Sequence, residues 1–211
     1  MKNALCIIAA ALGCYAGISH AATDALPDPL DHSWHITVTL PGSPPEEREV
    51  NGRFTLTYKS RLVEFNGALP DSSAKALPAD EHSYKLLGSP NFHTANNSPS
   101  TVASHETTAI VQETVSGTTK TLRSVPVSLG YTVVVDPFVS DPNPPVTVRT
   151  RVYLEHTVMA EGKAGKSPVS VTRKTDELQK AGDKQLITWS LDGHNYGLEL
   201  ELASITDNAK K

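Results

Sequence analysis

Hydrophobic and polar residues alternate along much of the chain, with the period of two that half-buried β-strands require. From Trp34 to Leu40, every second side chain is hydrophobic, and Pro41-Gly42 follows as a break. Further runs of this kind cover residues 53–58, 62–65, 84–87, 107–115, 121–127, 131–135 and 146–158. The pattern predicts a succession of short strands separated by turns.

The clearest local structure is a hairpin near the end of the chain. Asp192-Gly193 is a strong two-residue turn signal between two alternating runs. Folding the chain about this turn pairs Leu191 with His194, Trp189 with Tyr196, and Ile187 with Leu198. These pairs form one apolar face, so the register and the burial pattern agree. Asn51-Gly52 has the same kind of turn signal and is expected to open the strand over 53–58.

Only one short helix is predicted, over residues 175–181 before Gly182. Residues 66–106 are rich in Ser, Pro, Ala and Asn, which indicates a long loop interrupted by a strand over 84–87. We therefore expect an all-β fold, a single β-sandwich of roughly eight to ten antiparallel strands, with a barrel as the alternative. The expected domain spans 33–206, and a polar tail follows over 207–211.

The N-terminus has the three parts of a secretory signal peptide. Lys2 precedes an uncharged apolar stretch over 4–18, and Ser19-His20-Ala21 provides small residues for cleavage before Ala22. This predicts a signal peptide over 1–21, an extended leader over 22–32, and a periplasmic or extracellular mature protein. The alternative is a lipid anchor on Cys14, because Leu12-Gly13-Cys14 resembles a lipoprotein cleavage box.

Cysteine content and charge narrow the classes of protein further. Cys6 and Cys14 are the only cysteines and both lie in the predicted signal, so the mature chain would hold together without disulfides. The formal charge is −4, and removal of Lys2 makes it −5, which argues against a nucleic-acid partner. No apolar run after the signal is long enough to span a membrane.

Three histidines in the loop-rich middle, His82, His93 and His105, are the candidate metal ligands, because imidazole is a common metal ligand. Their spacing neither requires nor prevents convergence, and solvated loop histidines are the alternative interpretation. His156 shares the apolar face of its strand and is expected in the core.

A second candidate site is a polar stripe on the strand over 146–158. Arg149, Arg151 and Tyr153 alternate with hydrophobic residues and so share one sheet face. Two guanidinium groups and a phenol can bind a carboxylate or a sugar. An ordinary half-exposed sheet surface is the alternative interpretation.

Catalytic patterns are weak. Ser72-Ser73-Ala74-Lys75 has the Ser-x-x-Lys spacing of penicillin-recognising enzymes but lacks their companion motifs. Glu199 and Glu201 form a carboxylate pair on one strand face, which we interpret as a solvated polar face and not as an acid pair for glycoside cleavage. We therefore assign no catalytic residue and expect no cofactor.

The alternating strand from Trp34, the absence of mature cysteines and the closing Asn195-Tyr196-Gly197 resemble, at the level of pattern, cysteine-free fimbrial subunits. Such subunits donate a strand to the open sheet of the next molecule. The resemblance covers two short stretches and assigns no family. The first hypothesis is an exported, non-catalytic β-domain that binds an envelope protein or a small ligand through the long loop over 66–106. The alternatives are a fimbrial-type surface subunit and a periplasmic hydrolase.

Overall fold

The computed structural model describes residues 33–116, 118–162 and 165–210. The predicted signal peptide, the leader and both cysteines lie outside these ranges. The described strands are β1 (Ser33–Val38), β2 (Glu46–Phe65), β3 (Tyr84–Gly88), β4 (Asn91–Asn96), β5 (Ser100–Ser116), β6 (Thr119–Asp141), β7 (Thr147–Gly162), β8 (Gly165–Gln179), β9 (Lys184–Leu191) and β10 (His194–Asp207). Two short 3-10 helices, η1 (Glu81–Ser83) and η2 (Asn208–Lys210), complete the secondary structure of this part of the chain. No helix in it is long and apolar enough to cross a membrane.

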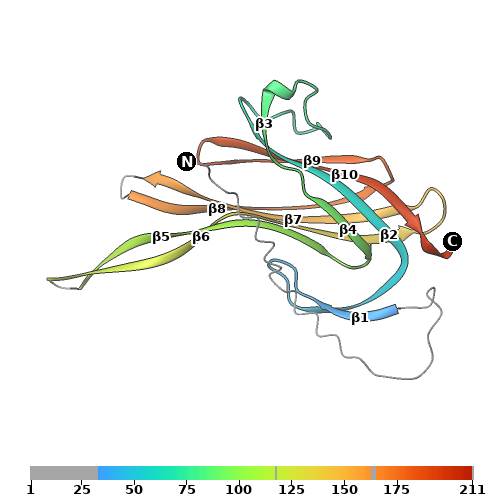
Figure 1. Cartoon of the computed structure of the whole chain (residues 1–211), viewed down its shortest axis with the longest axis horizontal. Helices are drawn as coiled ribbons and strands as arrows, with labels where there is room; N and C mark the ends of the chain where they lie inside the picture. The colour runs from blue at the N-terminus through green and yellow to red at the C-terminus, as the bar shows by residue number, and fades with distance from the viewer. Residues whose placement is uncertain (1–32, 117, 163–164, 211) are drawn as a thin grey trace, which may run out of the picture.

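The strands form two antiparallel sheets. The first has the order β1-β2-β10-β9, and β3 and β4 also pair with β2. Strands β3 and β4 pair with the edge of β2 opposite β10, which pairs with residues 54–65, and β1 pairs with residues 46–51 at the beginning of β2. The second sheet is a meander of four long strands in the order β5-β6-β7-β8. Figure 1 shows the two sheets in layers.

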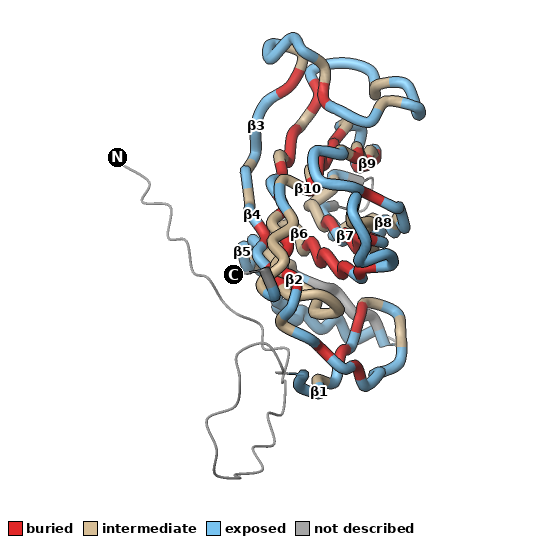
Figure 2. Tube along the Cα trace, turned by 90° about the vertical axis from the view of Figure 1, so that its right-hand side faces the viewer, coloured by how far each residue is buried: buried red, intermediate tan, exposed pale blue. Residues whose placement is uncertain are grey.

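The sheets pack face to face as a β-sandwich, as the sequence predicted, and do not close into a barrel. Alternate residues of both sheets point into one shared core, including Val133 and Val152 from the second sheet and Leu198 and Leu200 from the first. Figure 2 shows buried stretches, in red, along strands of both sheets. The core excludes water and so provides the main stabilisation of a fold without disulfides.

Two polar side chains of the core, Tyr58 and His156, make hydrogen bonds there. The Tyr58 hydroxyl lies 2.9 Å from the Thr150 hydroxyl across the two sheets. Burial raises the pKa of Tyr58 far above its usual range, so the phenol is neutral there. His156 is buried as expected, and its Nδ1 accepts a hydrogen bond of 3.2 Å from the Trp189 indole N–H. His156 therefore serves packing in the core.

The hairpin at Asp192-Gly193 has the predicted register in full, including Trp189 opposite Tyr196. Both turn residues have positive φ, 51° and 78°, as a tight hairpin turn requires.

Four other local predictions differ from the structure. Asn51-Gly52 lies inside the continuous strand β2, because the flanking residues pair with β1, β4 and β10 and do not pair with each other. Residues 175–179, predicted as helix, continue β8 along β7. Within the predicted loop over 66–106, β3 confirms the strand expected over 84–87, but β4 and the beginning of β5 were not predicted, so irregular structure is confined mainly to residues 66–80. The expected polar tail begins within β10, and Asn208 donates a hydrogen bond of 2.8 Å to the Gly52 carbonyl.

Candidate functional site

The three candidate metal ligands come from different elements. His82 lies in η1, His93 in β4 of the first sheet and His105 in β5 of the second sheet. His93 is within 3.2 Å of the Thr57 hydroxyl and His105 is within 2.8 Å of the Thr132 hydroxyl. Among the described residues, no three His, Cys, Asp or Glu side chains lie close enough to hold a metal ion. The geometry gives the predicted metal site no support.

The side chains of the polar stripe on β7 mostly contact other residues of the same molecule. Arg149 makes a bidentate ion pair with Asp176, with distances of 2.8 and 2.6 Å. The Arg149 guanidinium lowers the pKa of the Asp176 carboxyl. Arg151 pairs with Asp136 at 2.7 Å. Tyr153 is buried in a small apolar cluster under β1, with the Lys174 ammonium 5.1 Å from its ring centroid. Binding of a carboxylate or a sugar by these residues stays a prediction.

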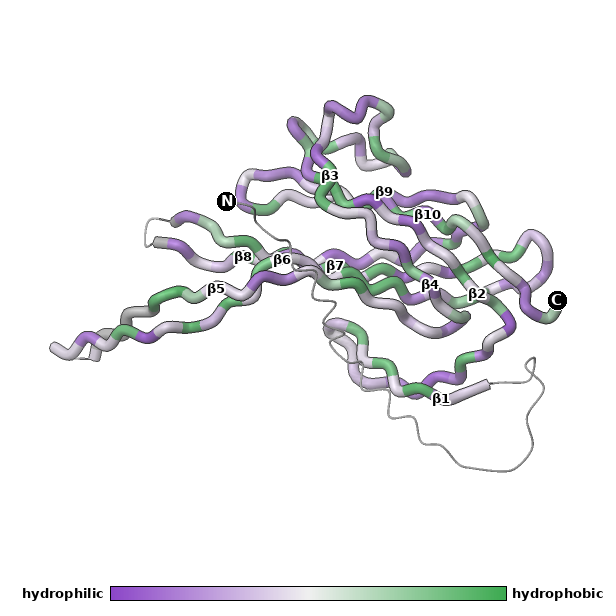
Figure 3. The backbone as a smooth tube through the Cα atoms, viewed as in Figure 1, coloured by the Kyte–Doolittle hydropathy of each residue, from purple (hydrophilic) through white to green (hydrophobic). Residues whose placement is uncertain are grey.

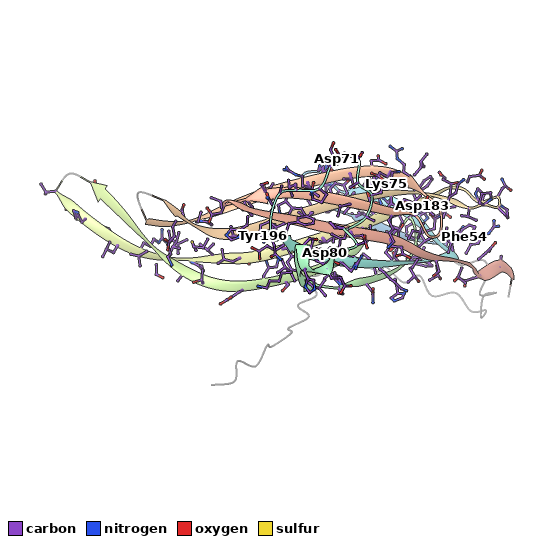
Figure 4. The ribbon with its side chains drawn as sticks, turned by 90° about the horizontal axis from the view of Figure 1, so that it is seen from above. Phe54, Asp71, Lys75, Asp80, Asp183 and Tyr196 are labelled. Carbon is purple, nitrogen blue, oxygen red and sulfur yellow. The ribbon has the colours of Figure 1, made fainter. Side chains whose placement is uncertain are left out.

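The carboxylate pair on β10 also has a structural role. Glu199 is buried and accepts hydrogen bonds from the Leu77 backbone N–H at 2.7 Å and from Arg61 at 2.8 Å. Burial alone would raise the pKa of Glu199, but the Leu77 N–H and Arg61 outweigh it, so the pKa is lowered. Glu199 therefore anchors residues 66–83 onto the outer face of the first sheet. Figure 4, seen from above, labels Asp71, Lys75 and Asp80 of this segment, which Figure 1 shows rising above the strands.

The Ser-x-x-Lys pattern forms no catalytic arrangement in the structure. Ser73 donates its backbone N–H and its hydroxyl to the Asp71 carboxylate, at 2.8 and 2.6 Å, in a tight turn. Residues 72–75 therefore do not share the helical turn that would bring Lys75 to Ser72. A turn closed by an aspartate is sufficient to explain these residues.

The most distinctive feature is a pair of hairpins that extend beyond the sandwich. Strand β6 pairs with β7 only over residues 130–141, so residues 119–129 pair with β5 alone. Residues 158–162 of β7 likewise pair only with β8. We call residues 105–129 the first arm and residues 158–169 the second arm. Figure 1 shows both arms projecting past the end of the first sheet, the first arm farther than the second.

Gly130 lies where the first arm leaves the sheet. Its φ is +128°, and a Cβ atom there would lie 1.9 Å from the Ser104 carbonyl oxygen. Only glycine fits this backbone, because any side chain would be strained and would collide with β5. Residues of β6 before Gly130 pair with β5 alone, and pairing with β7 begins at Gly130.

The outward direction of backbone groups in the first arm follows from its register. Ser116 and Thr119 close a two-residue hairpin loop, so pairs alternate from there between hydrogen-bonded and non-hydrogen-bonded. Ala109 then falls in a non-hydrogen-bonded pair with Pro126, which agrees with the missing N–H of proline. The N–H and C=O groups of Thr107, Ala109 and Val111 therefore point away from β6, toward the free edge of β5.

The other arm edges carry residues that discourage strand pairing. Pro126 blocks the β6 edge, Glu161 lies on the β7 edge, and Lys166 and Pro168 lie on the β8 edge. By contrast, residues 107–111 of β5 (Thr-Thr-Ala-Ile-Val) contain neither charge nor proline. We call this segment the open edge. It is a ready template for an added strand.

An open groove of about 480 Å³ lies along the open edge. Ile110 and Val111 of β5 and Leu129 of β6 line one side, and Met159 and Lys166 of the second arm line the other. Figure 3 shows hydrophobic residues continuing along the first arm beyond the body. The groove therefore gives an extended polypeptide both backbone partners and apolar contacts.

The sequence pattern predicted strands over 107–115 and 121–127 but missed that they leave the sandwich. The available signal was the position of Pro126 and Pro168 within alternating runs. Proline is excluded from central strands because it cannot donate to the ladder, so each proline marks an exposed edge.

No protein family matches this sequence and no curated protein is similar to it. Among solved structures, the InvG secretin domain β-barrel of the Salmonella SPI-1 injectisome has a TM-score of 0.33 and 12% identity over 70% of this chain. A cryo-EM structure of the Salmonella secretin InvG has the same TM-score and 11% identity over 70% of this chain. The chain spans 56% and 58% of those two secretin chains. Similarity at this level assigns neither a family nor a function.

Proposed function

We propose that this protein is an exported, non-catalytic β-sandwich that binds a polypeptide partner by strand addition to the open edge. The observation that carries the proposal is the contrast among the four arm edges. The β6, β7 and β8 edges bear proline or charge, whereas the β5 edge has a stretch, residues 107–111 between Glu106 and Glu113, that bears neither. In strand addition, main-chain hydrogen bonds give affinity and alternate side chains give specificity.

Export rests on the predicted signal over 1–21, and the non-catalytic role rests on the site geometry. Within the described residues, the histidines are scattered and the Glu199 carboxylate is engaged in internal contacts. An unprotected apolar edge on a projecting arm would promote aggregation unless it is covered by a specific partner. A partner bound by strand addition would cover this edge.

Photo-crosslinking in the cells that produce the protein tests the proposal. The crosslinking amino acid benzoylphenylalanine replaces Val111 on the open edge or, as the matched control, Leu122 on β6 of the same arm. Both side chains are 69% exposed, so simple accessibility is equal. We expect protein adducts from position 111 and few from position 122. Equal adducts from both positions, or none from position 111, would refute strand addition at this edge.

A further inference from the structure

We infer that the partner at the open edge is a second copy of this chain, paired antiparallel with β5 across a two-fold axis. This inference rests on the proposed function and names its partner. The first reason is that an antiparallel edge can pair with itself, since a two-fold axis presents the same surface on both subunits.

The register of such a pair follows from the outward backbone groups. With Ala109 opposite Ala109 of the second copy, Thr107 lies opposite Val111 and Val111 lies opposite Thr107. Residues 107, 109 and 111 all direct their N–H and C=O groups outward, so each of these pairs exchanges two hydrogen bonds. The register thus uses every outward group of the open edge.

The side chains suit the same register. The smallest side chain lies at the axis, and the β-branched Thr107 and Val111 form cross-strand pairs, which are favourable in antiparallel sheets. Thr107, Ala109 and Val111 are exposed on the same face of the arm, so the two copies would form one uncharged strip of small and β-branched side chains. The segment 107–111 contains no charged residue, so no like charges within it face each other across the axis, although each chain is negative overall.

The arm geometry keeps the two bodies apart. Strand β5 runs from the body at Ser100 to the tip at Ser116, so an antiparallel copy places its body beyond the tip of the first arm. The contact comprises one edge and the adjoining groove. This is smaller than the standard interface of about 1,600 Å² in total, so we expect a reversible dimer that depends on concentration.

Variants that introduce a charge at Ala109 test the two-fold register. In sedimentation velocity, the purified full chain should shift from monomer to dimer as its concentration rises. Ala109→Lys places two lysines opposite each other and should raise the dimer dissociation constant roughly tenfold or more. Ala109→Glu should have the same effect. An equal mixture of the two variants should recover dimerisation, because the residues facing across the axis then have opposite charges.

Ser124 supplies the matched control. It is exposed on the same face of the arm but lies on β6, opposite Val111. Ser124→Lys and Ser124→Glu should dimerise as the unchanged chain does, and circular dichroism should show native strand content in all four variants.

A chain that stays monomeric at every concentration overturns the inference, as does a dimer that Ala109→Lys leaves intact or a mixture that fails to associate. In these cases, crosslinks from position 111 to a different protein would still support strand addition. Loss of those crosslinks would refute the proposed function itself.

Discussion

The buried ion pairs of Asp136 lead to the sharpest stability prediction. Asp136 lies on β6 and is only 1% exposed. One carboxylate oxygen is 2.5 Å from Arg48 of β2, and the other is 2.7 Å from Arg151 of β7. The Arg48 side chain is 4% exposed, and Glu46 also contacts it. Asp136 therefore joins the N-terminal end of β2 to the outer face of the second sheet.

Asp136→Asn keeps the shape of the side chain but removes its charge. Arg48 is then left as a buried cation without its main counterion, and breaking a buried pair in this way costs about 3–5 kcal/mol. The matched control is Asp176→Asn, which disrupts the Arg149 pair one strand away. Those side chains are 57% and 42% exposed, and an exposed pair contributes about 0–1 kcal/mol.

Urea unfolding followed by tryptophan fluorescence measures both variants, because Trp189 is buried in the core. With a slope of about 2 kcal/mol per molar urea, Asp136→Asn should lower the midpoint by about 1.5–2.5 M. Asp176→Asn should lower it by about 0.5 M or less. Similar midpoints for the two variants would refute the argument that burial makes the Asp136 pairs important for stability.

Three further predictions concern Glu199, His156 and Gly130. Glu199→Gln should speed hydrogen exchange at the Leu77 amide and cost about 1.5–3 kcal/mol, because glutamine is neutral and its single acceptor oxygen cannot serve both the Leu77 N–H and Arg61; unchanged exchange would contradict this. Burial lowers the pKa of His156, so the unfolded chain takes up a proton first. The unfolding free energy should therefore fall as the pH drops below about 6.5, and His156→Leu, measured by urea unfolding from pH 8 to 5, should show a smaller fall. Gly130→Ala should lower the melting temperature measured by circular dichroism more than Gly67→Ala, where a Cβ has open space, because the new methyl would collide with Ser104.

The sequence by itself determined the all-β class and the features set by local chemistry. The hairpin at Asp192-Gly193 was predictable because the turn signal and the alternation on both sides agree. The burial of His156 followed from its place on the apolar face of β7. Alternation identifies which residues of a strand share a face, whichever strand lies beside it.

Only the tertiary structure decided which strands pair and where pairing stops. Asn51-Gly52 has a turn signal yet lies within β2, because β1 and β4 supply partners on either side of it. The open edge is likewise invisible in a list of strands, since a residue is on an edge only when no other strand lies beside it. Pairing joins residues that are far apart in the chain, and the local pattern of side chains does not show which distant strand a given strand pairs with.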